Sequence, residues 1–388
     1  MASDHPPASR PVRVLHLVHW PRSGITSVLK SLVAFSDKDS FEHHIAFLIG
    51  EPDEIRGFAA QGCTAVDLGF AHDPAGAILR LRATVGRQEG GLVHSHSFQP
   101  GVWGRLFHHR ERTGFLSSVH STYPYFLERT LGERVKSRVE QFSIKRVGHP
   151  VVAVSDAVRQ HLLAHTGIAP ELIRLIRNGI DTQVSFQPGT VDPAVRQAAN
   201  LGPQDRYAIT VARLSREKGT DILLRAWPAV GGKHRDLKLV VVGDGAEAGP
   251  LRELARELGV ADSVYFAGFQ SNVLTWLAGA ALFVNPSRFE GLPMGVLEAQ
   301  VARVPLVATA VGGVPEVVTD GVSGRLVAAE NPVALASAME DLLAHPERAR
   351  VMAENAYRKV RAGYDIRQTV RNHEDLYREI LAGRDRGR

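Results

Sequence analysis

The sequence predicts an α/β protein of two domains, each built on a doubly wound, Rossmann-like parallel sheet. Three observations lead to this prediction. The chain has 388 residues, more than the ~100 to 200 that one domain usually holds. Short apolar runs alternate with longer amphipathic segments, a pattern typical of parallel strands covered by helices on both faces. The alternation is lost at about residues 184–203 and then resumes, which indicates a linker between two domains.

The first domain is predicted to span residues 1–183. After a polar tail, residues 12–19 form an apolar run that predicts a buried strand, and a turn containing Pro21 and Gly24 leads into a helical pattern at 25–35. The remaining strands of this domain are predicted at 44–49, 91–95, 116–120 and 151–154.

The second domain is predicted to span residues 204–365 and repeats the same plan. Its strands are predicted at 207–212, 237–242, 264–266, 281–284 and 305–309, each followed by a turn and a helical pattern. A last amphipathic segment, residues 366–388, lies beyond the final helices of this domain. The sequence leaves open whether this helix packs back on the first domain.

Composition narrows the class of protein. A net charge of +5 suits an anionic partner, either a phosphorylated small molecule or an acidic membrane surface, but the excess is too small to demand nucleic acid. Cys63 is the only cysteine, so an intramolecular disulfide is impossible and the cytoplasm is the simplest location. With no signal-like N-terminus and no apolar stretch of ~18 residues, any membrane contact is expected to be peripheral.

No metal site is expected. The only Asp-x-Asp pattern, at Asp37 and Asp39, lies in an early polar turn rather than after a central strand. His94 and His96 alternate at a strand end, which could suit a metal or an acceptor site. Because no carboxylate or cysteine joins them locally, structural histidines with satisfied hydrogen bonds are the favoured interpretation.

The loops that follow the strands are the places to look for a site, because ligands of open parallel sheets bind beyond the carboxyl ends of the strands. Residues 213–219 form one such loop, with Arg213 and Lys218 before a helix that begins near Thr220. Two fixed cations and the free N–H groups of a helix start could converge on a phosphate. The alternative is that both are ordinary solvated charges.

A second informative segment follows the strand at 281–284. Pro293 suits a first helical turn, which puts Glu290 in the loop and Glu298 inside the helix. If the whole segment were helical, the two carboxylates would lie ~12 Å apart, so they cannot share one catalytic position but could address two ends of one long ligand. Glycines at 291 and 295 allow close approach of the backbone, and the amides of Leu292, Met294 and Gly295 could cradle an anion. Alternatively, Glu298 is simply a helix residue exposed to water.

This segment resembles the Glu-x7-Glu motif of the retaining glycosyltransferases of family 4, the glycosyl transferases of group 1. Further matches stand in the same order along the chain, at 211–219, 242–245, 266–268, 312–316 and 321–324. The similarity covers nearly all of the second half strongly and the first half weakly. It implies the GT-B fold, in which two Rossmann-like domains face each other across a cleft.

The resemblance implies a nucleotide diphosphate sugar, with UDP or GDP as the nucleotide, as the donor substrate, and no cofactor. Arg213 and Lys218 would hold the diphosphate, with help from the amides of Leu292, Met294 and Gly295. Glu298 would bind the ribose hydroxyls and Glu290 would orient the transferred sugar. Gly243 and Phe269 would lie near the nucleobase.

In the first domain, Gly24 is similar to the family's glycine in the loop that approaches the diphosphate, and His120 to its active-site histidine. The sequence departs from the family here, since it has Ser23-Gly24 where a Gly-Gly pair is common. The implied function is the transfer of a sugar to an acceptor hydroxyl, with retention of configuration, on a glycan or lipid-linked acceptor in bacterial polysaccharide or glycolipid synthesis.

Two Rossmann-like domains are also compatible with other functions. A nicotinamide dehydrogenase would carry Gly-x-Gly-x-x-Gly after the first strand, whereas residues 19–24 read His-Trp-Pro-Arg-Ser-Gly. A nucleotide-sugar epimerase or a sugar phosphorylase with the same fold stays open. A non-catalytic sugar-nucleotide-binding protein is disfavoured, because both Glu290 and His120 are present.

The excess positive charge gathers in the first domain. The segment 126–147 reads as a basic amphipathic helix, which fits peripheral contact with an acidic membrane at the cytoplasmic face. Its basic residues are Arg129, Arg134, Lys136, Arg138, Lys145 and Arg146, and its apolar residues are Leu127, Leu131, Val135, Val139, Phe142 and Ile144. An ordinary surface helix with its apolar side in the core is the simpler alternative.

Overall fold

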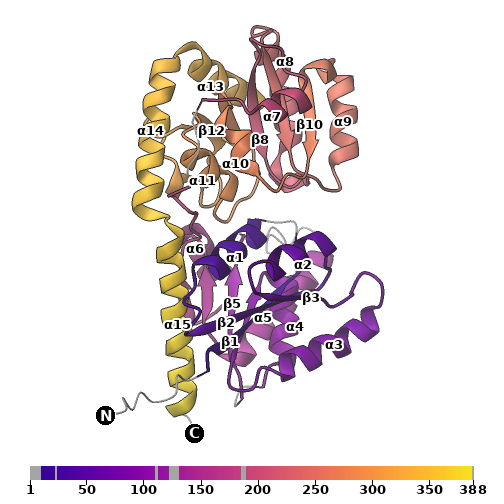
Figure 1. Cartoon of the computed structure of the whole chain (residues 1–388), viewed down its shortest axis with the longest axis vertical. Coiled ribbons are helices and arrows are strands. Elements are labelled where there is room, and N and C mark those ends of the chain that lie inside the picture. The colour runs from indigo at the N-terminus through magenta and orange to yellow at the C-terminus, as the bar shows by residue number, and fades with distance from the viewer. Residues whose placement is uncertain (1–9, 22–23, 110–111, 122–130, 185–188, 387–388) are drawn as a thin grey trace, which may run out of the picture. The chain divides into compact units, whose positions relative to one another are not determined.

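The computed structural model describes residues 10–21, 24–109, 112–121, 131–184 and 189–386. It divides into two compact units, residues 1–179 with 366–388, and residues 180–365. Each unit is a parallel sheet with helices on both faces (Figure 1), as the sequence predicts.

The first unit holds a seven-stranded sheet in the order β3-β2-β1-β4-β5-β6-β7, and every described pairing in it is parallel. Its strands are β1 (Val12–Val18), β2 (Phe41–Phe47), β3 (Thr64–Asp67), β4 (Leu92–His96), β5 (Gly114–Val119), β6 (Val151–Ala153) and β7 (Ile173–Leu175). The sequence analysis missed β3 and β7. Both are short edge strands, and β3 is largely exposed, so neither carries the apolar run of a buried strand.

The helices of the first unit are α1 (Gly24–Phe35), α2 (Pro52–Ala59), α3 (Pro74–Gly86), α4 (Phe98–Phe107), α5 (Leu131–Val147), α6 (Asp156–His165) and α15 (Ile366–Arg386). Side chains alternate along each strand, so β1 sends Val14 and Val18 to one face and Leu15 and Leu17 to the other. The first face is covered by α1, α2 and α15, and the second by α3 and α4.

The C-terminal helix α15 completes the core of the first unit. Leu376 and the fully buried Tyr377 pack against Val14, Leu92 and Leu116 of the sheet. The question that the sequence left open is therefore answered by burial: α15 supplies apolar cover that the sheet would otherwise lack.

The second unit holds a six-stranded parallel sheet in the order β10-β9-β8-β11-β12-β13. Its strands are β8 (Arg206–Val211), β9 (Leu237–Val242), β10 (Val264–Gly268), β11 (Leu282–Asn285), β12 (Leu306–Thr309) and β13 (Arg325–Val327). Five of these strands match the sequence prediction to within one or two residues at each end. The three-residue edge strand β13 was missed.

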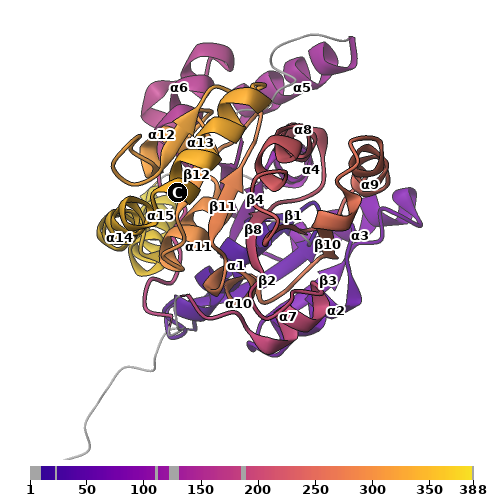
Figure 2. The ribbon, with the colours of Figure 1, turned by 90° about the horizontal axis from the view of Figure 1, so that it is seen from above.

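The helices of the second unit are α7 (Pro193–Ala198), α8 (Thr220–Gly231), α9 (Ala248–Glu257), α10 (Val273–Ala278), α11 (Met294–Val301), α12 (Val314–Val317), α13 (Pro332–Ala344) and α14 (Pro346–Gly363). Figure 2 shows α8, α9 and α13 on one face of the sheet and α10 and α11 on the other. The fully buried Trp227 of α8 lies in the main core cluster of this unit.

The boundary between the units differs from the prediction. Residues 180–183 were assigned to the first domain and 184–203 to a linker, whereas the structure assigns 180–203 to the second unit. A hydrogen bond from the Ile180 amide to the Tyr364 carbonyl holds this segment to the end of the second unit, and α7 lies within it. Its lack of periodicity reflects a short helix between loops.

Candidate functional site

The loops at the carboxyl ends of the second sheet are joined to one another through their backbones. Four hydrogen bonds make these links: Leu214 N to Asp244 O (2.8 Å), Gly243 N to Gly268 O (2.8 Å), Arg288 N to Glu217 O (2.8 Å) and Gly313 N to Gly291 O (3.0 Å). Loops from five neighbouring strands therefore form one connected surface, as the strand order of a doubly wound sheet allows.

Lys218 and Glu290 meet on this surface. The Lys218 ammonium lies 2.8 Å and 2.9 Å from the two oxygens of the Glu290 carboxylate. The Glu290 side chain is 7% exposed and that of Lys218 is 25% exposed, so solvent screens this ion pair only in part. The tertiary fold thus brings together two of the predicted site residues that are 72 positions apart in sequence.

Arg213 is arranged differently from Lys218. Its guanidinium pairs with the carboxylate of Glu217 in the same loop, and its side chain is 55% exposed. Gly219, which ends this loop, has a φ of +66°, and a Cβ there would come within 2.1 Å of the Pro286 carbonyl oxygen. A residue other than glycine would therefore push the 213–219 loop away from the loop that carries Glu290.

Two residues that the sequence analysis did not single out hold Glu290 and its loop. The Ser287 hydroxyl donates to the Glu290 carboxylate at 2.7 Å and shares its proton with the Asn285 side-chain oxygen at 2.6 Å. The Arg288 guanidinium binds both oxygens of Asp221 in α8, at 2.7 Å and 2.8 Å, and also the Arg216 carbonyl. The hydrogen bonds to Asp221 raise the pKa of Arg288 above its already high value. No single-sequence signal distinguishes such an arginine from a surface charge.

Glu298 lies in α11, as predicted, and Glu290 lies in the loop before it. Glu298 is half-buried rather than exposed, and burial raises the pKa of its carboxyl group to about 7. Such a group is readily perturbed by a ligand, because a hydroxyl donor would favour its ionised form. The alternative of a solvated helix residue is therefore wrong for Glu298.

The start of α11 carries the other predicted donor-binding residues. Leu292 is buried, while Met294 and Gly295 are partly exposed in the first turn of the helix. A Cβ on Gly295 would lie 2.9 Å from the Val211 carbonyl oxygen, so this glycine lets the helix start pack on the end of β8. That close approach of backbone to backbone places the first turn of the helix beside the end of β8, the strand that leads into the 213–219 loop.

Gly243 and Phe269 follow β9 and β10. Gly243 has a φ of +134°, and a Cβ there would lie 1.8 Å from the Ala212 carbonyl oxygen, which only glycine tolerates. Phe269 is 40% exposed at the end of β10. Both residues lie on the connected loop surface, at the edge of the sheet away from β11.

The first unit carries the two remaining predicted residues, each at the carboxyl edge of its sheet. Gly24 begins α1, directly after the β1 loop, and His120 follows β5. Residues 22 and 23, which include the Ser23 that departs from the family pattern, lie outside the described residues. Burial, with a smaller effect of His373, lowers the pKa of His120 to about 3, so its imidazole is neutral.

His94 and His96 are buried and hydrogen-bonded, in agreement with the structural interpretation. They lie with His16 in a group whose ligand atoms are all within 4.8 Å of one another, a geometry that a metal ion could use. Every ring nitrogen of the three already has a hydrogen-bonding partner: the His94 nitrogens contact Tyr377 and Ser118, and those of His16 and His96 contact other histidines.

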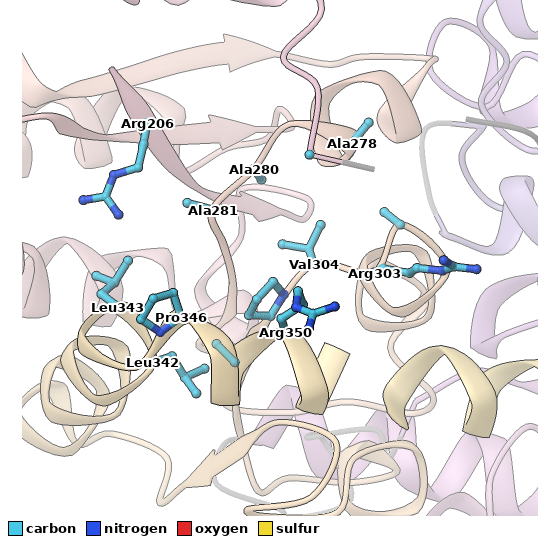
Figure 3. Close-up of a pocket in the computed structure, with 14 residues that line it drawn as sticks. Arg206, Ala278, Ala280, Ala281, Arg303, Val304, Leu342, Leu343, Pro346 and Arg350 are labelled. Atoms are coloured by element: carbon cyan, nitrogen blue, oxygen red, sulfur yellow. The ribbon is translucent and has the colours of Figure 1, made fainter. Parts of the chain in front are cut away.

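A cavity of about 400 Å³ lies at the opposite ends of the strands in the second unit (Figure 3), beside Arg206 at the start of β8 and Pro305 before β12. Three arginines line it, but each is paired: Arg206 with Asp236, Arg303 with Glu354 and Arg350 with Glu347. Figure 3 shows their side chains pointing in different directions rather than converging. Because these side chains do not converge, the cavity offers no common binding point for an anion, and the strand-end loops are the better site.

The basic helix has an unexpected surface. Residues 126–130 lie outside the described residues, as do the side chains of Lys136, Lys145 and Arg146. In the described part, Ile144 is buried, but four apolar residues are exposed: Leu131 (78%), Val135 (53%), Val139 (41%) and Phe142 (66%). The simpler interpretation, with the apolar side in the core, is thus wrong for most of α5. Among the described helices, none is both long and apolar enough to cross a bilayer.

Comparison with known proteins shows the family to which this chain belongs. Residues 191–359 match the family model of glycosyl transferases group 1, and residues 23–184 match that of glycosyltransferase family 4. The chain is 31% identical over 318 residues to D-inositol 3-phosphate glycosyltransferase 2 of Catenulispora acidiphila, covering 75% of this chain and 74% of that protein. This chain is a family 4 glycosyltransferase.

Other relatives of this glycosyltransferase carry different names. It is 28% identical over 320 residues to the alpha-D-kanosaminyltransferase of Streptomyces kanamyceticus, covering 78% of this chain and 81% of that one. Its fold is similar to that of Anabaena Alr3699/HepE, solved in complex with UDP-glucose, with a TM-score of 0.79 at 19% identity over 96% of this chain and 98% of the other. The glycosyltransferase therefore has the GT-B fold predicted from its motifs.

Proposed function

We propose that this glycosyltransferase moves a sugar from a nucleotide diphosphate sugar to an acceptor hydroxyl with retention of anomeric configuration, using the strand-end loops of the second unit as its donor site. The observation that carries the proposal is the Lys218–Glu290 ion pair, which puts a cation and a carboxylate side by side beside the start of α11. A donor needs both charges, a cation for its diphosphate and a hydrogen-bond acceptor for its sugar hydroxyls.

The donor diphosphate is bound by Arg213 and Lys218 together with the amides of Leu292, Met294 and Gly295. Both cations have carboxylate partners, Glu217 for Arg213 and Glu290 for Lys218, and these ion pairs hold them in place. When the bond between sugar and phosphate breaks, negative charge grows on the departing diphosphate. Fixed cations and helix N–H groups stabilise that charge more in the transition state than in the ground state.

The carboxylates recognise the two sugars of the donor. Glu298, with its raised pKa, accepts hydrogen bonds from the ribose hydroxyls in its ionised form. Glu290, which Ser287 and Lys218 hold in place, accepts hydrogen bonds from hydroxyls of the transferred sugar. Gly243 and Phe269 lie beside the nucleobase of a UDP- or GDP-sugar.

The chemical step exchanges one bond to the anomeric carbon for another on the same face. The bond from that carbon to the phosphate oxygen breaks, the bond to the acceptor oxygen forms, and the acceptor proton passes to an oxygen of the departing phosphate. In the first unit, Gly24 is assigned to the diphosphate and His120 to the transferred sugar, as the resemblance to the family implies. No metal is required, because Arg213 and Lys218 supply the positive charge.

We place the enzyme in the cytoplasm, acting on a glycan or lipid-linked acceptor in bacterial polysaccharide or glycolipid synthesis. Contact with an acidic membrane surface through α5 is part of this proposal. The support is the combination of exposed apolar residues with Arg134 and Arg138, which are exposed on the same helix. Phe142→Ser should reduce sedimentation with phosphatidylglycerol vesicles, whereas binding that is equal on phosphatidylcholine would contradict the charge argument.

The experiment that tests the donor is a thermal-shift screen against nucleoside diphosphates and nucleotide sugars, followed by turnover with the donor that stabilises most. The acceptor panel should include D-inositol 3-phosphate, because one relative bears that name. NMR of the product then reports its anomeric configuration. An inverted product would refute retention, and an epimerised donor formed without acceptor would identify a nucleotide-sugar epimerase instead.

A further inference from the structure

A continuous line of hydrogen bonds crosses the first unit from α15 to His120. It has five links: Ser36 Oγ to Glu374 Oε1 (2.8 Å), His43 Nε2 to Ser36 Oγ (2.9 Å), His16 Nε2 to His43 Nδ1 (2.9 Å), His96 Nε2 to His16 Nδ1 (3.0 Å) and His120 Nε2 to His96 Nδ1 (3.1 Å). We call this the histidine chain. It joins the predicted active-site histidine to a carboxylate on the C-terminal helix.

The alternation of side chains along the strands explains how four histidines come into line. His43, His16 and His96 lie on β2, β1 and β4, which are neighbours in the sheet, and His120 follows β5, the next strand. All four project to the face covered by α1 and α15, the face that also carries Val14 and Val18. Ser36 follows α1, and Glu374 lies on α15.

The histidines of the chain are neutral at physiological pH. His16 and His96 are at most 3% exposed, and burial lowers their pKa values well below the usual range. Burial, followed by the charge of Lys38, lowers the pKa of His43 to about 3. A neutral imidazole has one N–H donor and one bare nitrogen acceptor, so each histidine must donate one hydrogen bond and accept the other.

The carboxylate end sets the direction of every link. Glu374 can only accept, and its Oε1 receives both the Ser36 hydroxyl and the Asp37 amide. Because the only proton of Ser36 Oγ goes to Glu374, this oxygen must accept from His43 Nε2. His43 Nδ1 is then bare and accepts from His16 Nε2. In the same way, His16 Nδ1 accepts from His96 Nε2, and His96 Nδ1 accepts from His120 Nε2.

We propose that Glu374, acting through the histidine chain, holds His120 in the tautomer that carries its proton on Nε2 and leaves Nδ1 as a hydrogen-bond acceptor for a substrate hydroxyl. The use of Nδ1 toward the substrate rests on the proposed function. Nδ1 of His120 is buried and has no hydrogen-bond partner among the described residues, so it is the one unsatisfied acceptor in the histidine chain. Glu374 and Ser36 are positioning residues, since neither contacts the reacting atoms.

Other groups face the chain without interrupting it. His94 packs on His16 and His96 with ring centroids 5.2 Å and 4.1 Å away, and bonds to Tyr377 and Ser118. His373 of α15 bonds to the Thr369 carbonyl. A metal ion held by His16, His94 and His96 would be a rival use of the cluster, but it would need a ring nitrogen that the chain already occupies.

The tautomer of His120 can be measured directly by long-range ¹H–¹⁵N NMR of protein labelled at its 17 histidines, with His120→Asn used for assignment. We expect a protonated Nε2 and a bare Nδ1 in the wild-type protein. In Glu374→Met the acceptor is lost, the Ser36 proton turns to His43, and every link reverses, so the proton of His120 moves to Nδ1. Glu374→Gln keeps an acceptor oxygen and should preserve the wild-type tautomer.

Activity provides the second readout. We expect Glu374→Met to lower kcat about tenfold or more, equivalent to one lost hydrogen bond. Glu379→Met is the matched control. Glu379 lies on the same helix but is exposed and pairs with Arg174 instead of contacting the histidine chain. Ser36→Ala is a second way to break the chain if Glu374→Met does not fold.

The outcomes separate this inference from the proposed function. Wild-type His120 protonated on Nδ1, or a tautomer that does not respond to Glu374→Met and Ser36→Ala, would overturn the histidine chain as a tautomer lock. Stoichiometric zinc in the purified protein would overturn it too, in favour of a metal site. If the tautomer of His120 changes in Glu374→Met but kcat does not, the histidine chain still sets the tautomer, and only the role of Nδ1 toward the substrate is refuted. Absence of all glycosyl transfer would count only against the proposed function.

Discussion

Replacing Lys218 by alanine should affect stability and catalysis by two separate routes. The structure gives Glu290, 7% exposed, two contacts of 2.8 Å and 2.9 Å to the lysine and one of 2.7 Å to Ser287. Removing one partner of a buried pair costs ~3 to 5 kcal/mol. Because Lys218 is 25% exposed and Ser287 still donates, we expect a smaller loss of unfolding free energy, ~2 kcal/mol.

The catalytic loss has a different origin. Lys218→Ala removes a cation from the departing diphosphate, and the loss of one such contact lowers kcat ~100-fold, or ~2.7 kcal/mol. The double variant Lys218→Ala with Glu290→Gln exchanges the unpaired carboxylate for a neutral amide. It should regain ~1 kcal/mol of unfolding free energy relative to Lys218→Ala without regaining kcat.

Urea unfolding followed by circular dichroism measures the first quantity, and steady-state turnover at saturating donor measures the second. A loss of kcat below threefold in a folded Lys218→Ala protein would refute the assignment of Lys218 to the leaving group. If the double variant were less stable than Lys218→Ala, the reasoning from the buried carboxylate would be wrong.

Three further predictions concern the same site. Arg213→Lys should still lower kcat, because a guanidinium can bind two phosphate oxygens at once and an ammonium cannot. The kcat losses of Arg213→Ala and Lys218→Ala should be less than additive in the double variant, and strictly additive losses would mean that the two cations act independently. Donor binding should tighten as the pH rises through about 7, because the ionised form of Glu298 accepts hydrogen bonds from the ribose hydroxyls. In calorimetric titrations with the nucleotide sugar, Glu298→Gln should weaken binding and remove this pH dependence. A wild-type Kd that stays constant from pH 6 to 8 would refute this role of Glu298. Activity should survive EDTA, and abolition by EDTA with rescue by Mn²⁺ would show that a metal neutralises the diphosphate instead.

The local patterns of the chain were sufficient for the architecture. Continuous apolar runs in the buried strands and a period of 3.6 in the helices are properties of consecutive residues, so β9 was predicted with both ends correct and most other buried strands to within one to three residues. The same local reasoning placed Glu290 in a loop and Glu298 in a helix, because a proline and two glycines mark that boundary. The edge strands β3, β7 and β13 were not predicted, because short or exposed strands lack an apolar run.

The contacts that define the site depended on the tertiary structure. Whether Lys218 meets Glu290 depends on how two loops 72 residues apart approach each other, and Gly219 and Arg288 control that approach. Likewise, α5 has an amphipathic sequence, yet only packing decided that most of its apolar residues stay exposed.

The sequence by itself determined two doubly wound sheets and the loops that carry the charged residues, because both follow from short-range periodicity and turn chemistry. Only the tertiary structure decided that α15 covers the first sheet and that Glu374 connects to His120 through histidines on three neighbouring strands. The physical reason is that strand order, register and helix docking bring these residues together from positions 16 to 374, and no local propensity encodes a hydrogen bond across that separation.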